Sequence, residues 1–179
     1  GIFMLIVLLG AGNGLIHAFE QSASERAMNS IKIFPGWTSK SYDGLKEGRR
    51  IRLDNKDLNT TNKNFPDHVI KAGATVYQGG VNLSFGPEYV NLNLSGVYPN
   101  HTEVEVVKLF KGRFINEIDI KERRKVIVLH KKTAEILFDK THTDPIGQFV
   151  NAGNVVYQVV GLYNDKGDSG DSDAYLPFT

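Results

Sequence analysis

The stretch KVIVLHKKTAEILF occupies residues 125–138 and carries the sharpest structural signal in the chain. Residues 126–129 are four consecutive apolar side chains, three of them β-branched, which is typical of a strand buried on both faces. The residues that follow repeat apolar side chains at helical spacing. We therefore expect a buried strand at 125–130, followed directly by a short helix at 131–139.

Downstream of this unit, the sequence predicts a hairpin and one further strand. Residues 147–163 are rich in β-branched and aromatic side chains, and Asn-Ala-Gly-Asn at 151–154 supplies turn residues in their middle. The run AYLPF at 174–178 predicts a last strand. Between the two lies NDKGDSGDSD at 164–173, which is acidic and glycine-rich and is expected to be a solvated loop.

Upstream of the unit, three segments alternate apolar and polar side chains as half-buried strands do. They are ATVYQ at 74–78, VNLSFG at 81–86 and YVNLNLSGV at 89–97. Glycines separate them, so we expect turns at 79–80 and at 86–88.

Three shorter elements complete the expected secondary structure. Ile31 and Ile33 flank a lysine and predict a strand that Pro35 ends. Residues 54–65 predict a weak helix, and residues 102–110 predict another that ends before Gly112. Because helices and strands mix without a regular βαβ rhythm, the fold class predicted is α+β.

The first 28 residues admit three interpretations: a phosphate loop, a helix face for close packing, or the end of a membrane span. Gly10 and Gly12 fit the dinucleotide pattern G-x-G-x-x-G, but Leu15 stands at its third glycine. No acidic residue follows at the end of a second strand, so nucleotide binding is disfavoured.

No formally charged side chain occurs from Ile2 to Phe19, and apolar residues then recur at helical spacing to Met28. We expect a helix over this range, and interpret it as the outer part of a membrane span whose first turns are missing. Gly10 and Gly14 would permit close packing or a bend near the membrane surface.

Composition excludes several kinds of chemistry. The chain has no cysteine, which removes thiol nucleophiles and cysteine-based zinc sites. Lys plus Arg is 21 and Asp plus Glu is 20, so the net charge of +1 gives no reason to expect nucleic acid. Carboxylates such as Glu117 and Asp119 are expected to form a solvated face, and the five scattered histidines are expected to be surface or satisfied core groups.

No catalytic, cofactor-binding or metal-binding residues are predicted. The sequence has no G-x-S-x-G or S-x-x-K motif, and the aspartates of 165–173 do not follow the spacing of a calcium-binding EF-hand. Arg113 and the loop 165–173 are the only candidates for a binding site, and a solvated loop is favoured over a calcium site.

A set of short motifs, in this order and spacing, resembles the MacB/FtsX/LolC type of ABC-transporter permease. The likeness is to the extracytoplasmic domain that follows the first transmembrane helix, and it covers most of the chain. The motifs are Gly112-Arg113-Phe114, Leu137-Phe138, Pro145-Ile146-Gly147, Val159-Val160-Gly161 and Pro177-Phe178-Thr179, with 12–15, 37–39 and 42–53 further upstream.

The shared residues have structural interpretations. Gly147 is expected where the chain turns sharply after Pro145, and Gly161 where the second strand of the hairpin ends. Leu137 and Phe138 are expected to pack the short helix onto the sheet.

The resemblance implies a porter-like βαβ part and a second, β-rich part. Residues 1–28 would be the end of the first span and its extension, 29–115 the first stretch of the porter-like part and 116–166 the β-rich part. Residues 167–179 would return to the porter-like part and be truncated, leaving a sheet edge open to another chain.

The resemblance also implies a function without chemistry of its own. A cytoplasmic ATP-binding subunit or domain would drive motion, and the helix would carry that motion from the inner membrane to this domain in the periplasm. Implied partners are that ATPase, a membrane-fusion adaptor, a second permease copy, and lipid around the N-terminal helix. The alternative is a free-standing envelope binding domain that a single helix tethers.

Overall fold

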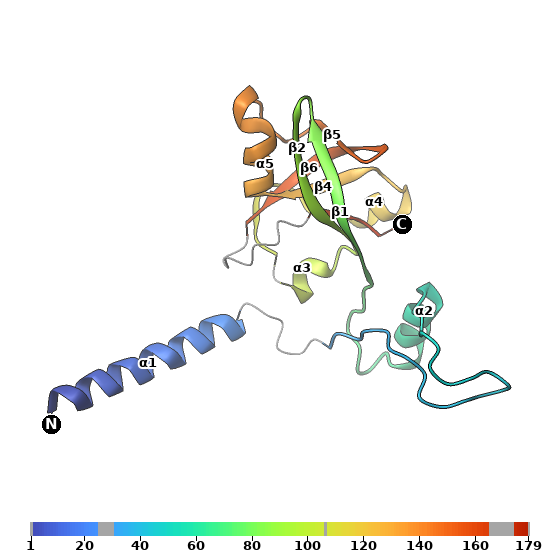
Figure 1. Cartoon of the computed structure of the whole chain (residues 1–179), viewed down its shortest axis with the longest axis horizontal. Helices are drawn as coiled ribbons and strands as arrows, with labels where there is room; N and C mark the ends of the chain where they lie inside the picture. The colour runs from blue at the N-terminus through green and yellow to red at the C-terminus, as the bar shows by residue number, and fades with distance from the viewer. Residues whose placement is uncertain (1, 25–30, 106, 165–173, 179) are drawn as a thin grey trace.

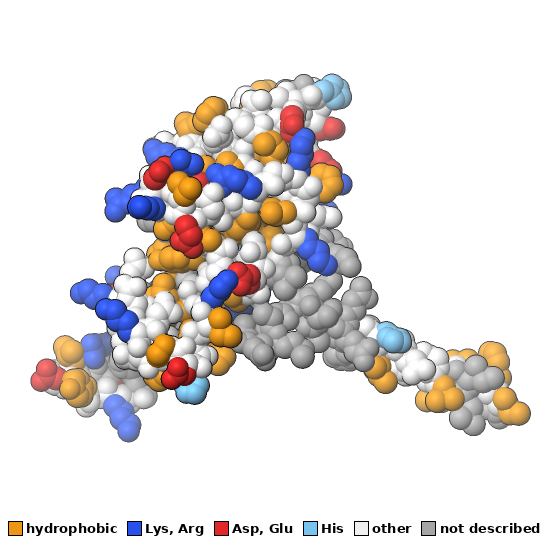
Figure 2. All heavy atoms as spheres, turned by 180° about the vertical axis from the view of Figure 1, so that it is seen from behind, with side chains coloured by type: hydrophobic (Ala, Val, Ile, Leu, Met, Phe, Trp, Pro, Cys, Tyr) orange, Lys and Arg blue, Asp and Glu red, His pale blue; other side chains and the backbone are white. Residues whose placement is uncertain are grey.

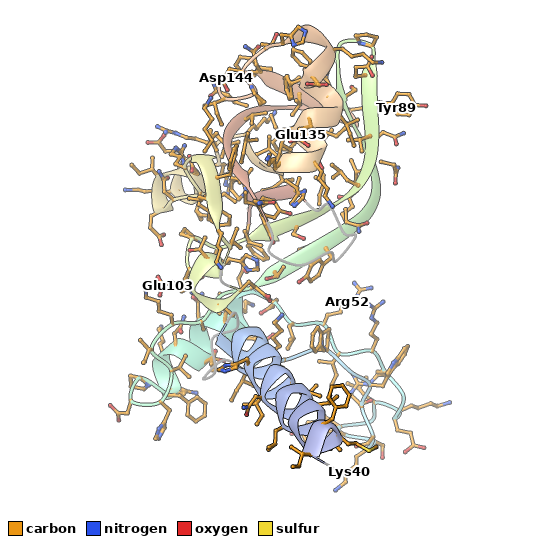
Figure 3. All side chains as sticks on the ribbon, turned by 90° about the vertical axis from the view of Figure 1, so that its left-hand side faces the viewer. Lys40, Arg52, Tyr89, Glu103, Glu135 and Asp144 are labelled. Carbon is orange, nitrogen blue, oxygen red and sulfur yellow. The ribbon has the colours of Figure 1, made fainter. Side chains whose placement is uncertain are left out.

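The computed structural model describes residues 2–24, 31–105, 107–164 and 174–178. One end of the molecule carries α1 (Ile2–Ser24) and residues 31–74, while the strands form the other end (Figure 1). Residues 31–74 alone, without α1, are called the arm. Turned by 90°, the molecule keeps this division, with Lys40 and Arg52 at the lower end and Tyr89 and Asp144 at the upper (Figure 3).

Helix α1 confirms the expected N-terminal helix as far as Ser24, and its last predicted residues, 25–28, lie outside the described part. The apolar side chains that the structure describes in this helix are exposed, with Phe3 81% and Leu8 66% accessible. Among the residues described, none of the helices combines the length and the hydropathy needed to cross a bilayer.

The arm contains little regular structure. The strand expected at residues 31–33 is wrong, because this segment pairs with no strand and its Ile31 and Ile33 are 88% and 72% exposed. A β-bridge joins Trp37 to Arg50 and makes residues 37–50 a loose loop.

Helix α2 (Asn55–Asn64) confirms the helix expected before Pro66. It begins in a capping box: Asp54 accepts from the backbone N–H of Asp57 at 3.1 Å, and Asp57 accepts from the N–H of Asp54 at 2.8 Å. None of its residues is buried. Local capping, and not packing, therefore stabilises this helix.

Seven strands form one sheet at the other end of the molecule. They are β1 (Thr75–Phe85), β2 (Glu88–Val97), β3 (Leu109–Gly112), β4 (Val126–His130), β5 (Phe149–Ala152), β6 (Val155–Tyr163) and β7 (Ala174–Pro177). Neighbouring strands pair in the order β6–β4–β7–β2–β1–β5. Because β5 also pairs with β6, these six strands close a ring. Strand β3 lies outside the ring and pairs with β6. Residues 75–178 are called the strand region below.

The strand β1 differs from the prediction of two strands separated by a turn at Gly79-Gly80. It runs without a break, and the register of its pairing with β2 shifts between Gln78 and Val81. Such a shift is a β-bulge, in which Gly80 adopts a φ of +70°, a conformation that glycine tolerates. The turn expected at 86–88 is confirmed.

The main core lies inside the ring. Residues from β1, β2, β4, β5 and β6 pack there with helix α5 (Lys131–Phe138), whose Leu137 and Phe138 are 0% and 2% exposed. Every residue of β4 is buried, as the sequence predicted, because Ile127 and Leu129 face this core while Val128 faces a second, smaller one.

Two short helices and the strand between them revise the prediction for residues 101–121. Helix α3 (His101–Val104) is one turn long, so the helix expected over 102–110 is too long, and its last residues belong to strand β3. Helix α4 (Glu117–Lys121) was not predicted. A 3-10 turn, η1 (Asp139–Thr141), follows α5.

The glycines of the shared motifs have the expected structural character, with one change. Gly147 turns the chain after Pro145 with a φ of +86°. Gly161 does not end β6 but lies inside it, where a Cβ would collide with the carbonyl oxygen of Arg113. Close approach of two backbones, and not the strand end, requires glycine at position 161.

Candidate functional site

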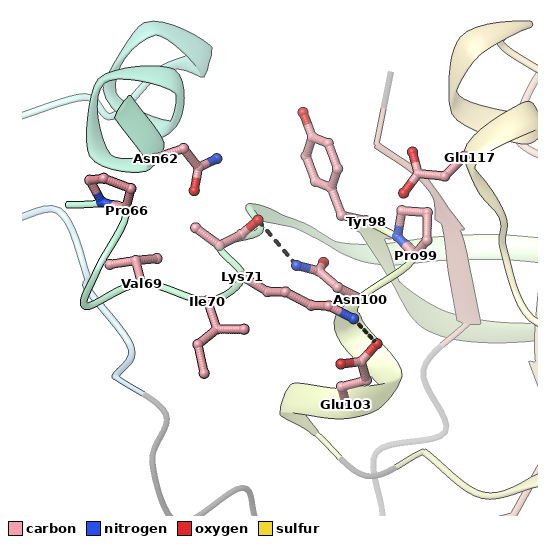
Figure 4. A pocket seen from close by; sticks show the side chains of 11 residues that line it. Asn62, Pro66, Val69, Ile70, Lys71, Tyr98, Pro99, Asn100, Glu103 and Glu117 are labelled. Atoms are coloured by element: carbon pink, nitrogen blue, oxygen red, sulfur yellow. Dashed lines mark hydrogen bonds and ion pairs between the residues drawn. The ribbon is translucent and has the colours of Figure 1, made fainter. Parts of the chain in front are cut away.

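A groove lies where the arm meets the strand region (Figure 4). Its volume is about 550 Å³, within the usual range of ligand sites. Helix α2 and the loop after it contribute one wall, and the segment from Tyr98 to Glu103 contributes the other. The lining residues are Asn62, Pro66, Val69, Ile70, Lys71, Ala72, Tyr98, Pro99, Asn100, Glu103 and Glu117.

Two contacts hold the walls of the groove together. The amide Nδ2 of Asn100 donates to the carbonyl oxygen of Ala72 at 3.1 Å. The Nζ of Lys71 lies 2.5 Å from Oε1 of Glu103, but both side chains are more than half exposed. An ion pair so exposed contributes little to stability, so the pair holds the two walls together only weakly.

The groove offers binding groups but no catalytic arrangement. Its polar side chains are amides, one lysine–glutamate pair and the carboxylate of Glu117, beside the ring of Tyr98 and two prolines. No nucleophile lies next to a base within it. In the described part of the chain, no three His, Asp or Glu side chains come close enough to hold a metal ion.

Arg113, one of the two predicted site candidates, is engaged in a structural pair. Its Nη1 and Nη2 donate to the two carboxylate oxygens of Asp119, at 2.6 and 3.0 Å. Nη1 also donates to the carbonyl oxygen of Phe114 at 3.0 Å. These bonds join the end of β3 to α4, and they leave this guanidinium 40% exposed.

Asp119 corrects the expectation of a solvated carboxylate face, because its side chain is fully buried. Burial alone raises the pKa of this carboxyl, but the hydrogen bonds from Arg113 and from the backbone N–H of Asn116 outweigh burial and hold the pKa below its ordinary value. The sequence signal was present: Asn116 and Asp119 form a capping box at the start of α4. Glu117 is exposed, as expected.

The loop 165–173, the other candidate, lies outside the described residues. Two histidines are core groups with partners. His130 accepts from the backbone N–H of Lys132 at 3.2 Å and caps α5. His101 lies 5.1 Å from the ring of Tyr175, and burial lowers its pKa, with Glu105 opposing that shift and Lys32 adding to it.

Charge is mixed on the surface. The face shown in Figure 2 carries basic and acidic side chains interspersed over the molecule, with apolar side chains gathered along the projecting α1. A surface of mixed sign lacks the basic stripe with which proteins bind nucleic acid.

Two solved structures share this fold. The extracellular domain of the noncanonic ABC-type transporter YknZ from Gram-positive bacteria matches with a TM-score of 0.61 and 25% identity, over 70% of this chain and 63% of that chain. The periplasmic region of MacB from Actinobacillus actinomycetemcomitans matches with a TM-score of 0.60 and 25% identity, over 71% and 56%. The class that the fold defines is the extracytoplasmic domain of an ABC-type transporter.

The chain belongs to the family of MacB-like periplasmic core domains, whose family model matches residues 1–179. Similar curated relatives are macrolide export ATP-binding/permease proteins MacB, 27% identical in Neisseria meningitidis and 23% identical in Bartonella henselae. All of this chain aligns with them, but it spans 27% of their length. The resemblance that the motifs indicated is therefore confirmed.

Proposed function

We propose that this domain transmits ATP-driven motion of a permease to substrate export or to a partner in the cell envelope. The single observation that carries the proposal is α1: a 23-residue helix, apolar through most of its length, leads into a domain of the MacB-like family. A helix is a stiff element, so displacement at one end reaches the other.

The partners belong to the same proposal. The named relatives are ATP-binding/permease proteins, which supports a cytoplasmic ATP-binding subunit or domain as the source of motion. A membrane-fusion adaptor and a second permease copy would meet the domain outside the membrane, and lipid would surround α1. The domain would lie in the periplasm, anchored to the inner membrane, and perform no catalysis itself.

The division into a porter-like part (29–115) and a β-rich part (116–166) remains a proposal. Strand β7 pairs in parallel with β2 of the first part and antiparallel with β4 of the second. The pairing with β2 is the longer of the two and supports the return of residues 167–179 to the first part. The ring of strands runs across both boundaries, so the two parts would share one core.

Labelling tests the location. Because this chain has no cysteine, Asn59→Cys on the exposed surface of α2 can be introduced into a full-length protein whose other cysteines have been replaced. A maleimide that does not cross the inner membrane should label Asn59→Cys in intact cells. Labelling only after lysis, as for a cysteine in a cytoplasmic control protein, would contradict an extracytoplasmic position.

Substitution of Gly14 tests the coupling. A Cβ at Gly14 meets nothing within 4 Å, so Gly14→Leu should leave the domain folded. We expect Gly14→Leu to lower efflux of a labelled macrolide while ATP hydrolysis continues, and Gly14→Ala to have the smaller effect. Unchanged efflux in Gly14→Leu would count against α1 as the coupling element.

The alternative, an envelope binding domain tethered by one helix, predicts a different gene. A permease gene encodes further apolar membrane spans, and the same gene or a neighbouring gene encodes an ATP-binding domain. A gene without either would favour the tethered domain and contradict the coupling proposal.

A further inference from the structure

One surface of the strand region is free of charge although it faces solvent. Residues 75–97 contain a single charged residue, Glu88, and residues 149–163 contain none, whereas the whole chain has 21 basic and 20 acidic residues. Glu88 itself pairs with Lys140 at 2.9 Å. Solvated strand faces ordinarily carry charged side chains, so their absence here calls for an explanation.

The strand register places exposed side chains of the three neighbouring strands β2, β1 and β5 on one face. Ser84 of β1 lies opposite Tyr89 of β2 and Asn151 of β5. The residues between them, Leu83 and Val150, point inward and are fully buried. Alternation therefore directs a common set of side chains outward, which we call the amide face: Asn82, Tyr89, Asn91, Asn93, Phe149 and Asn151.

The amide face presents hydrogen-bonding groups that the protein leaves largely unused. Nδ2 of Asn91 donates to Oδ1 of Asn82 at 2.8 Å, which leaves the other amide groups of both residues available. Within the described residues, the side chains of Asn93 and Asn151 make no hydrogen bond. Amides both donate and accept, so this face can satisfy a ligand that carries hydroxyl groups.

Two aromatic rings stand beside these amides. Tyr89 is 71% exposed and Phe149 is 59% exposed, and Tyr89 projects away from the molecule (Figure 3). An exposed ring offers a flat apolar surface at little entropic cost when it binds. Three strands spaced about 4.8 Å apart give the face a width of about 10 Å, enough for an extended ligand.

We propose that the amide face binds a neutral carbohydrate chain. A charged ligand would find no counter-charge here, and the acyl chains of a lipid would leave the asparagine amides without hydrogen bonds. A neutral sugar matches both the amides and the aromatic rings of this face. Its hydroxyl groups form hydrogen bonds with the asparagine amides, and its C–H faces pack on the rings of Tyr89 and Phe149. This binding goes beyond the proposed coupling and does not depend on it.

Calorimetry on the full-length protein in lipid nanodiscs tests the proposal with a panel of hexasaccharides. The neutral probes are maltohexaose, cellohexaose, mannohexaose and the N-acetylglucosamine hexamer, and the charged control is hexagalacturonate. We expect a neutral probe to bind with a Kd of about 1 mM or tighter. Tyr89→Ala and Asn91→Ala should each weaken it about tenfold, while Tyr89→Phe should retain most of the affinity.

The matched control is Tyr42→Ala, which removes a tyrosine that is 78% exposed in the arm and should leave binding unchanged. Circular dichroism of each variant separates loss of binding from loss of folding. The proposal is overturned if no neutral probe binds, if hexagalacturonate binds as well, or if Tyr89→Ala binds as wild type. It is also overturned if Tyr89→Ala only dissociates a protein dimer without affecting any sugar.

Discussion

The strand region and the arm differ in what stabilises them. The strand region closes a ring around buried side chains, with Leu83, Ile127 and Val159 fully buried. No residue of the arm, 31–74, is buried, and its one helix depends on capping. Apolar burial contributes most of the stability of a fold, so we infer that the strand region holds this domain together and that the arm is free to adapt to what it contacts.

Truncating one leucine in each region gives the largest expected contrast. Leu129→Ala removes a fully buried side chain of β4 and should lower the free energy of unfolding by about 2–5 kcal/mol. Leu53→Ala in the arm, where the side chain is 49% exposed, should change it by less than about 0.5 kcal/mol. Urea denaturation followed by circular dichroism measures both, and similar losses would break the comparison.

A glycine-to-alanine substitution in each region adds one methyl group and compares how closely the two regions are packed. At Gly161 a Cβ would collide with the carbonyl of Arg113, so Gly161→Ala should cost about 1–3 kcal/mol. At Gly36 in the arm a Cβ meets nothing within 4 Å, so Gly36→Ala should be nearly neutral. Thermal melts report the difference, and a neutral Gly161→Ala would show that β3 and β6 separate more easily than described.

Two capping boxes allow a sharper comparison. Asp119 and Asp57 occupy the same third position of their helices, but Asp119 is buried against Arg113 and Asp57 is exposed. Asp119→Asn should cost about 1–3 kcal/mol, since it weakens bonds to a partly buried guanidinium. Asp57→Asn should cost about 0.5 kcal/mol. Equal effects in urea denaturation would mean that the pair with Arg113 adds nothing.

The lowered pKa of Asp119 predicts how pH acts on that contribution. The carboxylate stabilises the folded state fully above the ordinary carboxyl pKa of about 3.9. Stability is then lost as pH falls through the lowered pKa of the folded state. Melting midpoints measured from pH 6 to pH 2 should therefore fall less steeply in Asp119→Asn than in the wild type, and identical slopes would contradict the linkage.

The smallest expected effect concerns His101. Because burial lowers its pKa, the unfolded chain binds more protons below about pH 6.5, and stability should decline between pH 7 and pH 5. His101→Phe should flatten this decline. A decline that persists unchanged in His101→Phe would assign it to other groups.

Sequence alone predicted the elements that local pattern dictates. The apolar run at 126–129 and the helical spacing after it gave β4 and α5, and turn residues placed the β5–β6 hairpin. The order of short motifs also indicated the family, whose model matches the whole chain. The groove was not predicted, since its walls come from segments that are distant in sequence.

Tertiary structure decided the strand pairing, the burial and the backbone contacts that depend on residues distant in the sequence. Ile31 and Ile33 alternate like a strand, yet no partner strand reaches them. Gly79-Gly80 looks like a turn, but pairing with β2 stretches it into a bulge. By sequence Asp119 resembles a surface carboxylate, and it is buried because Arg113, which follows β3, bonds to it. Gly161 is required because the backbone of Arg113 approaches it too closely for a Cβ. Short-range pattern fixes local conformation, whereas burial and pairing are properties of the assembled ring.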